Sequence, residues 1–206
     1  MLNILNSHRK YESTAKVIFP STRLVYHGCH GELKEDSPNE FKSIYAINKF
    51  ACEQYLRLYS QVFEIPYCIF RICVPYGTLI KEASSYGTAE FMLNKAKEKQ
   101  NIVLYGDGNV RRTLVHIEDL CRLLLLGACS IECKNDVFNI GGEDYSLLEM
   151  ADLIAKRYNV EVEFTPWPNL ALKTESGSTV FNSEKLNRAI GGFKYQEFKS
   201  WCQKQV

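Results

Sequence analysis

Short apolar runs alternate with helical segments along the chain, and this alternation restricts the possible folds more than any other feature. The run at 67–74 (YCIFRICV) is almost continuously apolar, which is typical of a strand buried on both faces. The same reasoning predicts strands at 16–20, 102–105, 113–116, 137–140 and 160–164. Because strands separated by helices need crossover connections, we expect an α/β fold with a mainly parallel sheet.

The predicted helices lie between these strands. The longest spans 43–63, and its apolar residues recur at spacings that share one helical face: Ile44, Ile47, Ala51, Tyr55, Leu58 and Val62. Shorter helices are expected over 89–99, 117–128 and 183–190. Ser146 and Glu149 have the spacing of a capping box, which predicts a further helix from 150 to 158.

Composition excludes several classes of protein. Lys and Arg total 25 against 24 Asp and Glu, a balance that argues against a nucleic-acid-binding protein. The longest apolar run, 123–129, is too short to span a membrane, and the first residues (MLNILNSHRK) lack the pattern of a signal peptide. The 8 cysteines include no C-x-x-C pair, and several lie in apolar runs, as buried thiols do in a reducing compartment. We expect a soluble cytoplasmic protein.

Tyr45 and Lys49 lie one turn apart at the start of the longest predicted helix, so their side chains share a face. A cation one turn away favours the phenolate form of a tyrosine, and such a pair can exchange a proton with a hydroxyl near neutral pH. The alternative is an ordinary solvent-exposed face, because this spacing is common. Ser21 and Thr22 follow a predicted strand, where functional groups gather in open α/β sheets, although such residues also serve in turns and caps.

Six segments occur in the order found in one enzyme family. They are FPSTRLVYHG, YAINK, FRICVPYG, LYGDGNVRRTLVHIEDL, FNIGGEDYSLLEMADLI and FNSEKLNRAIGGF. Their order resembles the extended short-chain dehydrogenase/reductases, and specifically the NAD-dependent nucleotide-sugar epimerases and dehydratases of the UDP-glucose 4-epimerase type.

The resemblance implies a partial Rossmann-type parallel sheet with a small C-terminal α/β substrate-binding domain. Residues 1–76 would form the part of the dinucleotide-binding domain that this chain contains. Residues 77–206 would form mainly the substrate-binding domain, with about 112–140 returning to the Rossmann domain. The family also implies NAD as cofactor, a nucleoside-diphosphate sugar as substrate, and a homodimer through the helix before Thr22 and the Tyr45 helix.

The resemblance implies a role for each site residue. Tyr45 would be the acid/base on the sugar hydroxyl, and Thr22 would orient that hydroxyl. Lys49 would bind the nicotinamide ribose and favour the phenolate of Tyr45. The strand that ends with Val74 and Pro75 would lie beside the nicotinamide.

Arg112 would pair with the substrate diphosphate, since a planar guanidinium suits phosphate oxygens, and Arg111 beside it could compete for that role. Two positions depart from the family pattern around this function. Val74 stands where the family usually has an asparagine that helps to hold the diphosphate, and His27 is an extra residue in the loop beside the site.

Arg23 and Leu24 are a third departure, and they narrow the reaction. In the sugar 4,6-dehydratases the residues after the catalytic threonine are acidic and perform the water elimination, and decarboxylating relatives use a nearby glutamate. Arginine and leucine cannot act as acids or bases at neutral pH. The resemblance therefore leaves an epimerase, with a simple nucleotide-sugar reductase as the alternative.

A compact cluster of potential metal ligands consists of His27, Cys29, His30 and Glu32. Its spacing fits no strong metal motif, and the segment occupies a variable loop in the resembling family, so we predict no metal site.

Three further polar residues are interpreted as structural. Arg71 lies within an apolar strand and is expected to pair with a buried carboxylate or carbonyl rather than with substrate. His116, at a strand end, and Asp119, in the following helix, are expected to stabilise the fold.

In this family a Gly-rich turn, G-x-x-G-x-x-G, cradles the pyrophosphate of the dinucleotide at the start of a helix. No glycines of this chain have that spacing after a strand. We therefore expect the C-terminal portion of an epimerase that binds NAD poorly by itself. Two alternatives are completion of the site by another chain or by a rearranged dimer, and a non-catalytic remnant that binds nucleotide sugars or a partner.

Overall fold

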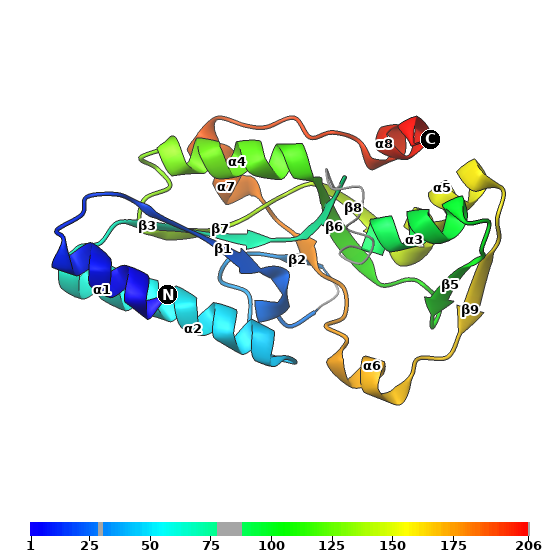
Figure 1. Ribbon diagram of the computed structural model, residues 1–206, viewed down its shortest axis with the longest axis horizontal. Coiled ribbons are helices and arrows are strands. Elements are labelled where there is room, and N and C mark those ends of the chain that lie inside the picture. The colour runs from blue at the N-terminus through cyan, green and yellow to red at the C-terminus, as the bar shows by residue number, and fades with distance from the viewer. Residues whose placement is uncertain (29–30, 78–87, 206) are drawn as a thin grey trace.

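The structure is a computed structural model and describes residues 1–28, 31–77 and 88–205. Its first sheet is parallel, with the strand order β1-β3-β7. Two helices cover each face of this sheet (Figure 1). The strands are β1 (Val17–Thr22), β3 (Tyr67–Ile72) and β7 (Asp136–Asn139), and the helices are α1 (Leu2–Lys10) and α2 (Ile44–Phe63) on one face and α4 (Ile117–Cys129) and α7 (Glu184–Ile190) on the other. The α/β fold with parallel strands is confirmed.

Polar side chains determine where several helices begin and end. The Ser43 hydroxyl accepts a hydrogen bond from the Ala46 backbone N–H at 3.1 Å, which caps the start of α2. The capping box predicted from Ser146 and Glu149 is confirmed at the start of α5 (Leu147–Tyr158). The Glu149 N–H donates to the Ser146 hydroxyl at 3.0 Å, and the Ser146 N–H donates to the Glu149 carboxylate at 2.7 Å.

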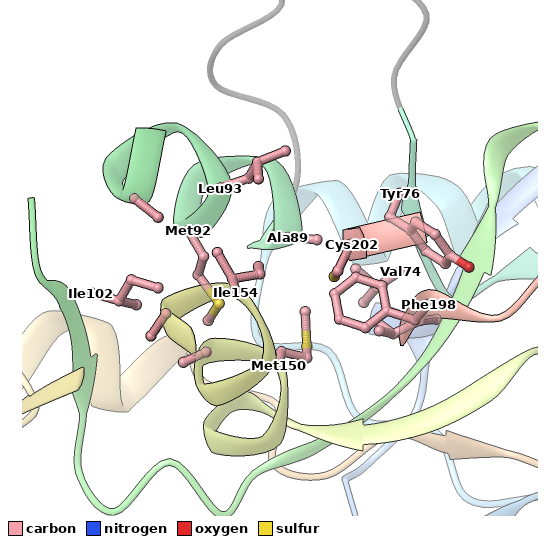
Figure 2. Close-up of a cluster of buried hydrophobic side chains, with 14 of the residues drawn as sticks. Val74, Tyr76, Ala89, Met92, Leu93, Ile102, Met150, Ile154, Phe198 and Cys202 are labelled. Atoms are coloured by element: carbon pink, nitrogen blue, oxygen red, sulfur yellow. The ribbon is translucent and has the colours of Figure 1, made fainter. Parts of the chain in front are cut away.

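Elements that begin with residue 74 build two more small sheets, on the right of Figure 1. Strand β6 pairs in parallel with β4 and antiparallel with β8, while β5 pairs in parallel with β9. Figure 2 shows the core between them, to which Met92, Ile102, Met150, Ile154 and Phe198 contribute. The elements are β4 (Val74–Tyr76), β5 (Ile102–Tyr105), β6 (Arg111–His116), β8 (Glu143–Ser146), β9 (Val162–Thr165), α3 (Thr88–Lys97), α5 and α8 (Phe198–Lys204).

The remaining elements are short and connect distant parts of the sequence. Strand β2 (Glu32–Leu33) pairs in parallel with β10 (Val180–Phe181). The 3-10 turn η1 (Arg23–Val25) follows β1 directly, and helix α6 (Asn169–Thr174) follows β9. The pairing of β2 with β10 joins the segment after η1 to the segment after α6. The segment 175–179, between α6 and β10, contacts both η1 and β6.

The apolar face predicted for α2 points away from the sheet. The residues that α2 buries are instead Ala46, Glu53 and Leu56. Exposed on the outside are Ile44, Ile47, Tyr55, Leu58 and Val62. Although α2 is the longest helix, no helix in the described part of the chain combines the length and the apolar character that crossing a membrane would require.

Candidate active site

Thr22 is the last residue of β1 and lies at the carboxyl end of the parallel sheet. Its hydroxyl accepts a hydrogen bond from the Leu24 N–H at 3.3 Å and so caps η1. The neighbouring Ser21 hydroxyl donates to Glu53 at 2.5 Å inside the protein. Both residues are buried, but the Ser21 hydroxyl is held by Glu53, whereas Thr22 is the residue that ends the strand.

Tyr45 and Lys49 project from the first turns of α2, which packs against β1 and η1. The Lys49 ammonium donates to the carbonyl oxygen of Pro20 at 2.7 Å and lies 5.7 Å from the centre of the Tyr45 ring. Tyr45 is 52% exposed, so its ring is open to solvent. The contact with Pro20 brings Lys49 next to β1 only two residues before Thr22.

Arg112 lies inside the protein, with 4% of its surface exposed. Its guanidinium donates to the Glu175 carboxylate at 2.5 Å, to the Gly177 carbonyl at 2.5 Å and to the Arg111 carbonyl at 3.0 Å. Burial lowers the pKa of Arg112, against the attraction of Glu175. Arg111, by contrast, is partly exposed and pairs with Glu149 at 3.1 Å. In this arrangement, Arg112 already binds a carboxylate of its own chain.

Arg23 is a second cation that contacts the segment 175–179. In the sequence it was interpreted only as a position that lacks the acidic residue of the dehydratases. Its Nη1 donates to the hydroxyls of Ser176 at 2.9 Å and Thr179 at 3.3 Å. Burial, and then repulsion by Arg112, lower the pKa of Arg23 to about 10. The signal available in the sequence was its position directly after Thr22.

Arg71 pairs with a buried carboxylate, as its position in an apolar strand predicted. The carboxylate belongs to Glu53 of α2, and the two form hydrogen bonds of 3.2 and 2.8 Å. Arg71 also donates to the Glu35 carbonyl at 2.9 Å and lies over the Tyr26 ring. Because Ser21 also donates to Glu53, this network joins the helix of Tyr45 to the strand of Thr22.

Val74 and Pro75 lie on β4, just beyond the carboxyl end of β3. The Val74 side chain is buried in the core that Figure 2 shows, whereas Pro75 is exposed. Of these two residues expected beside the nicotinamide, Pro75 therefore offers an open surface, and Val74 contributes packing.

The potential metal ligands do not form a cluster among the described residues. His27 pairs with Glu40, and the Glu32 carboxylate accepts a hydrogen bond from Asn182 at 2.8 Å. Cys29 and His30 lie outside the described residues.

The contacts of His116 and Asp119 match the structural roles expected for them. The Asp119 carboxylate accepts a hydrogen bond from the Gln196 backbone N–H at 2.6 Å. The His116 ring packs edge-on against Tyr76, and its Nδ1 accepts from the Glu118 N–H at 3.3 Å, which caps α4.

Known proteins share this fold. Pal from Bacillus thuringiensis superposes with a TM-score of 0.88 at 23% identity, over 98% of this chain and 64% of its own. UDP-glucose 4-epimerase from Thermotoga maritima superposes with a TM-score of 0.85 at 22% identity, over 98% of this chain and 65% of its own. These similarities support a Rossmann-like fold for the chain.

Two of the sequence relatives are named as nucleotide-sugar epimerases. A putative UDP-glucose 4-epimerase of Methanocaldococcus jannaschii is 30% identical over 74% of this chain and 50% of its own length. The CDP-paratose 2-epimerase of Salmonella typhi is 28% identical over 92% of this chain and 63% of its own length. The chain thus spans between half and two thirds of these curated relatives. Residues 1–141 also match the NAD dependent epimerase/dehydratase family, so the chain belongs to that family.

Proposed function

We propose that this chain carries the acid/base and substrate-binding residues of a nucleotide-sugar epimerase that acts at a ring hydroxyl, as a 4-epimerase does. The observation that carries this proposal is the packing of the Tyr45–Lys49 turn against the end of β1. Lys49 binds the Pro20 carbonyl at 2.7 Å, two residues before Thr22. A tyrosine, a lysine and a threonine at the carboxyl end of a parallel sheet are suited to proton exchange with a bound hydroxyl.

In this proposal Tyr45 takes the proton from the sugar hydroxyl and later returns it. Thr22 holds the same hydroxyl by a hydrogen bond, and Lys49 keeps positive charge beside the phenolate as it forms. NAD, when bound, supplies the hydride acceptor. The residues of this chain fit the nicotinamide-ribose end of that cofactor, where Lys49 is a cationic donor and Pro75 an open surface. The printed sequence has no glycine spacing suited to the pyrophosphate.

Arg23 and Leu24 support epimerisation over dehydration or decarboxylation. With its pKa lowered to about 10, Arg23 stays protonated at neutral pH and cannot act as the base, and Leu24 has no titratable group. By the resemblance, elimination of water or carbon dioxide from the sugar would need an acidic side chain next to Thr22.

We propose the same division of the chain as the resemblance implies, with the boundary at residue 76. Strand β7 then returns to the sheet of β1 and β3. The outward apolar residues of α2 support a homodimer through α1 and α2, because apolar residues gathered on an exposed helix face are typical of an interface between subunits.

A second candidate is a nucleotide-sugar-binding module without turnover. In such a module the same residues would bind the nucleotide sugar, and Tyr45 would transfer no proton.

The experiment incubates the chain with NAD and UDP-glucose and measures UDP-galactose by anion-exchange chromatography. We expect Tyr45→Phe to lower the rate at least about 100-fold, as the loss of an acid/base does. The matched control is Tyr55→Phe, a substitution of an exposed tyrosine on the same helix. Turnover that survives Tyr45→Phe contradicts the mechanism. Binding of UDP-glucose by calorimetry without any turnover supports the second candidate instead.

A further inference from the structure

Three cations from distant parts of the sequence meet on the 175–179 segment. Arg23 donates to the hydroxyls of Ser176 and Thr179. Arg112 reaches the Glu175 carboxylate and the Gly177 carbonyl, and the Lys42 ammonium donates to the Glu175 carbonyl at 3.0 Å.

The carboxylates of this region do not balance these charges. Glu175 Oε1 is shared between Arg112 and the Gly177 N–H, which donates to it at 3.0 Å. Glu40 lies 4.0 Å from Lys42 but also pairs with His27. The hydrogen bonds of Arg23 go to hydroxyls, which carry no charge.

The pKa of Arg23 is lowered by its buried position and by its positively charged neighbour. Burial and repulsion from Arg112 outweigh the attraction of Glu175. A guanidinium held in such surroundings gains from an added anion, because charge-assisted hydrogen bonds are stronger where water is excluded.

The backbone keeps this region close to the proposed reaction site. Arg23 follows Thr22 directly, so their Cα atoms are about 3.8 Å apart. The loop after η1 packs tightly on the 175–179 segment, since a Cβ at Gly28 would clash with the Ser176 carbonyl oxygen. Arg23 is therefore the chain neighbour of the threonine that would hold the sugar hydroxyl, and its guanidinium is held by the 175–179 segment.

We propose that Arg23 binds a carboxylate on the sugar, so that the preferred substrate is a nucleoside-diphosphate uronic acid rather than a neutral sugar. This inference rests on the proposed function and specifies its substrate class. In a hexuronic acid the carboxylate is bonded to C5, the neighbour of the ring carbon that bears the 4-hydroxyl, and Arg23 is the neighbour of Thr22 in the chain. The planar fork of arginine suits a carboxylate, with the hydroxyls of Ser176 and Thr179 keeping the guanidinium in place.

A phosphate oxygen is the other anion that this guanidinium could hold, so the test compares three ligands. The dissociation constants of UDP, UDP-glucose and UDP-glucuronic acid are measured by calorimetry for the wild-type chain and for Arg23→Met, Arg23→Lys and Arg122→Met. Arg122 is an exposed arginine on α4 and provides the matched control.

We expect the wild type to bind UDP-glucuronic acid at least about tenfold more tightly than UDP-glucose, which corresponds to about 1.4 kcal/mol. Arg23→Met should reduce this ratio to below about twofold, Arg23→Lys should leave an intermediate ratio, and Arg122→Met should retain the full preference. The ratio within each variant corrects for any loss of folded protein.

Other outcomes overturn the inference. Equal binding of the two sugars by the wild type removes the preference. If Arg23→Met weakens UDP as much as UDP-glucuronic acid, then Arg23 holds the diphosphate and not the sugar. In both cases the binding of UDP-glucose leaves the proposed function standing. A chain that binds none of the three ligands overturns the proposed function together with the inference.

Discussion

Arg71 in β3 and Glu53 in α2 form a two-point ion pair in the interior, with 2% and 0% of their side-chain surfaces exposed. The pair joins the helix that carries Tyr45 to the central strand of the first sheet, and Ser21 ties the same carboxylate to β1. Removing one partner of a buried ion pair leaves an uncompensated charge, which costs much more than the net stabilisation that the pair provides.

We expect Glu53→Gln to lower the free energy of unfolding by about 3–5 kcal/mol, because Arg71 then stays charged in the interior. Urea denaturation followed by circular dichroism measures this change. Glu98→Gln, at an exposed glutamate, is the control and should change stability by less than about 0.5 kcal/mol.

The double variant Glu53→Leu/Arg71→Met tests the physical reason. Because it removes both charges, it should be more stable than Glu53→Gln alone. If the double variant is no more stable than Glu53→Gln, the uncompensated charge is not the source of the loss.

The exposed apolar residues of α2 give a prediction for the proposed homodimer. Leu58 is 54% exposed on the outside of this helix, and Leu58→Glu would place a charge in the interface. We expect sedimentation velocity to show a shift from dimer to monomer at micromolar concentration. Leu125→Glu is the matched control, since Leu125 is 67% exposed on α4, across the sheet from α2 (Figure 1).

A wild-type chain that sediments as a monomer contradicts the dimer. So does a variant that remains dimeric after Leu58→Glu, because a buried unpaired carboxylate in an apolar interface is strongly unfavourable.

The long elements could be predicted from the sequence because periodicity and capping are local properties. The helix over 43–63 and the strand at 102–105 are both present in the structure, and Ser146 forms its capping box. The two-residue strands β2 and β10 could not be predicted, because they exist only through pairing of residues 32–33 with 180–181.

In the candidate site, too, the sequence could indicate that a residue needs a partner but not which partner the fold provides. The sequence indicated that Arg71 needs a buried acceptor, but many carboxylates could serve, and only the fold selects Glu53. Arg112 was expected to bind a diphosphate, and the structure gives it Glu175 as an ion-pair partner, 63 residues further along the chain. The apolar face of α2 was visible in the sequence, but whether it faces the sheet or the outside depends on the register of packing.

Burial separates six of the described cysteines into two reactivity classes. Cys121 and Cys129 are exposed on α4, whereas Cys68, Cys73, Cys133 and Cys202 are buried. Because the thiolate is the reactive form, we expect an exposed thiol to react with a maleimide at pH 8 much faster than a buried one. Peptide mapping after a short pulse should find the label on Cys121 and Cys129. Equal labelling of Cys73 in the folded chain would contradict the packing described here.

Because of its buried thiols, we expect the chain to lose stability at alkaline pH. Burial raises the pKa of Cys73 and of Cys202 from 9.0 to about 12. Between these two values the unfolded chain loses each thiol proton while the folded chain keeps it, so the folded state binds more protons. The stabilisation is fully present below pH 9 and is lost as the pH rises towards about 12.

Substitution of one cysteine measures how much its thiol contributes to the fall in the free energy of unfolding with rising pH. Each buried thiol contributes up to about 1.4 kcal/mol per pH unit, so Cys202→Ala should flatten the fall in the free energy of unfolding above pH 9 by up to that amount. Urea denaturation at a series of pH values from about 8 to 10.5 measures the slope. Cys121→Ala removes an exposed thiol on α4 and should leave the slope unchanged. If both variants keep the wild-type slope, the alkaline loss of stability comes from groups other than Cys202.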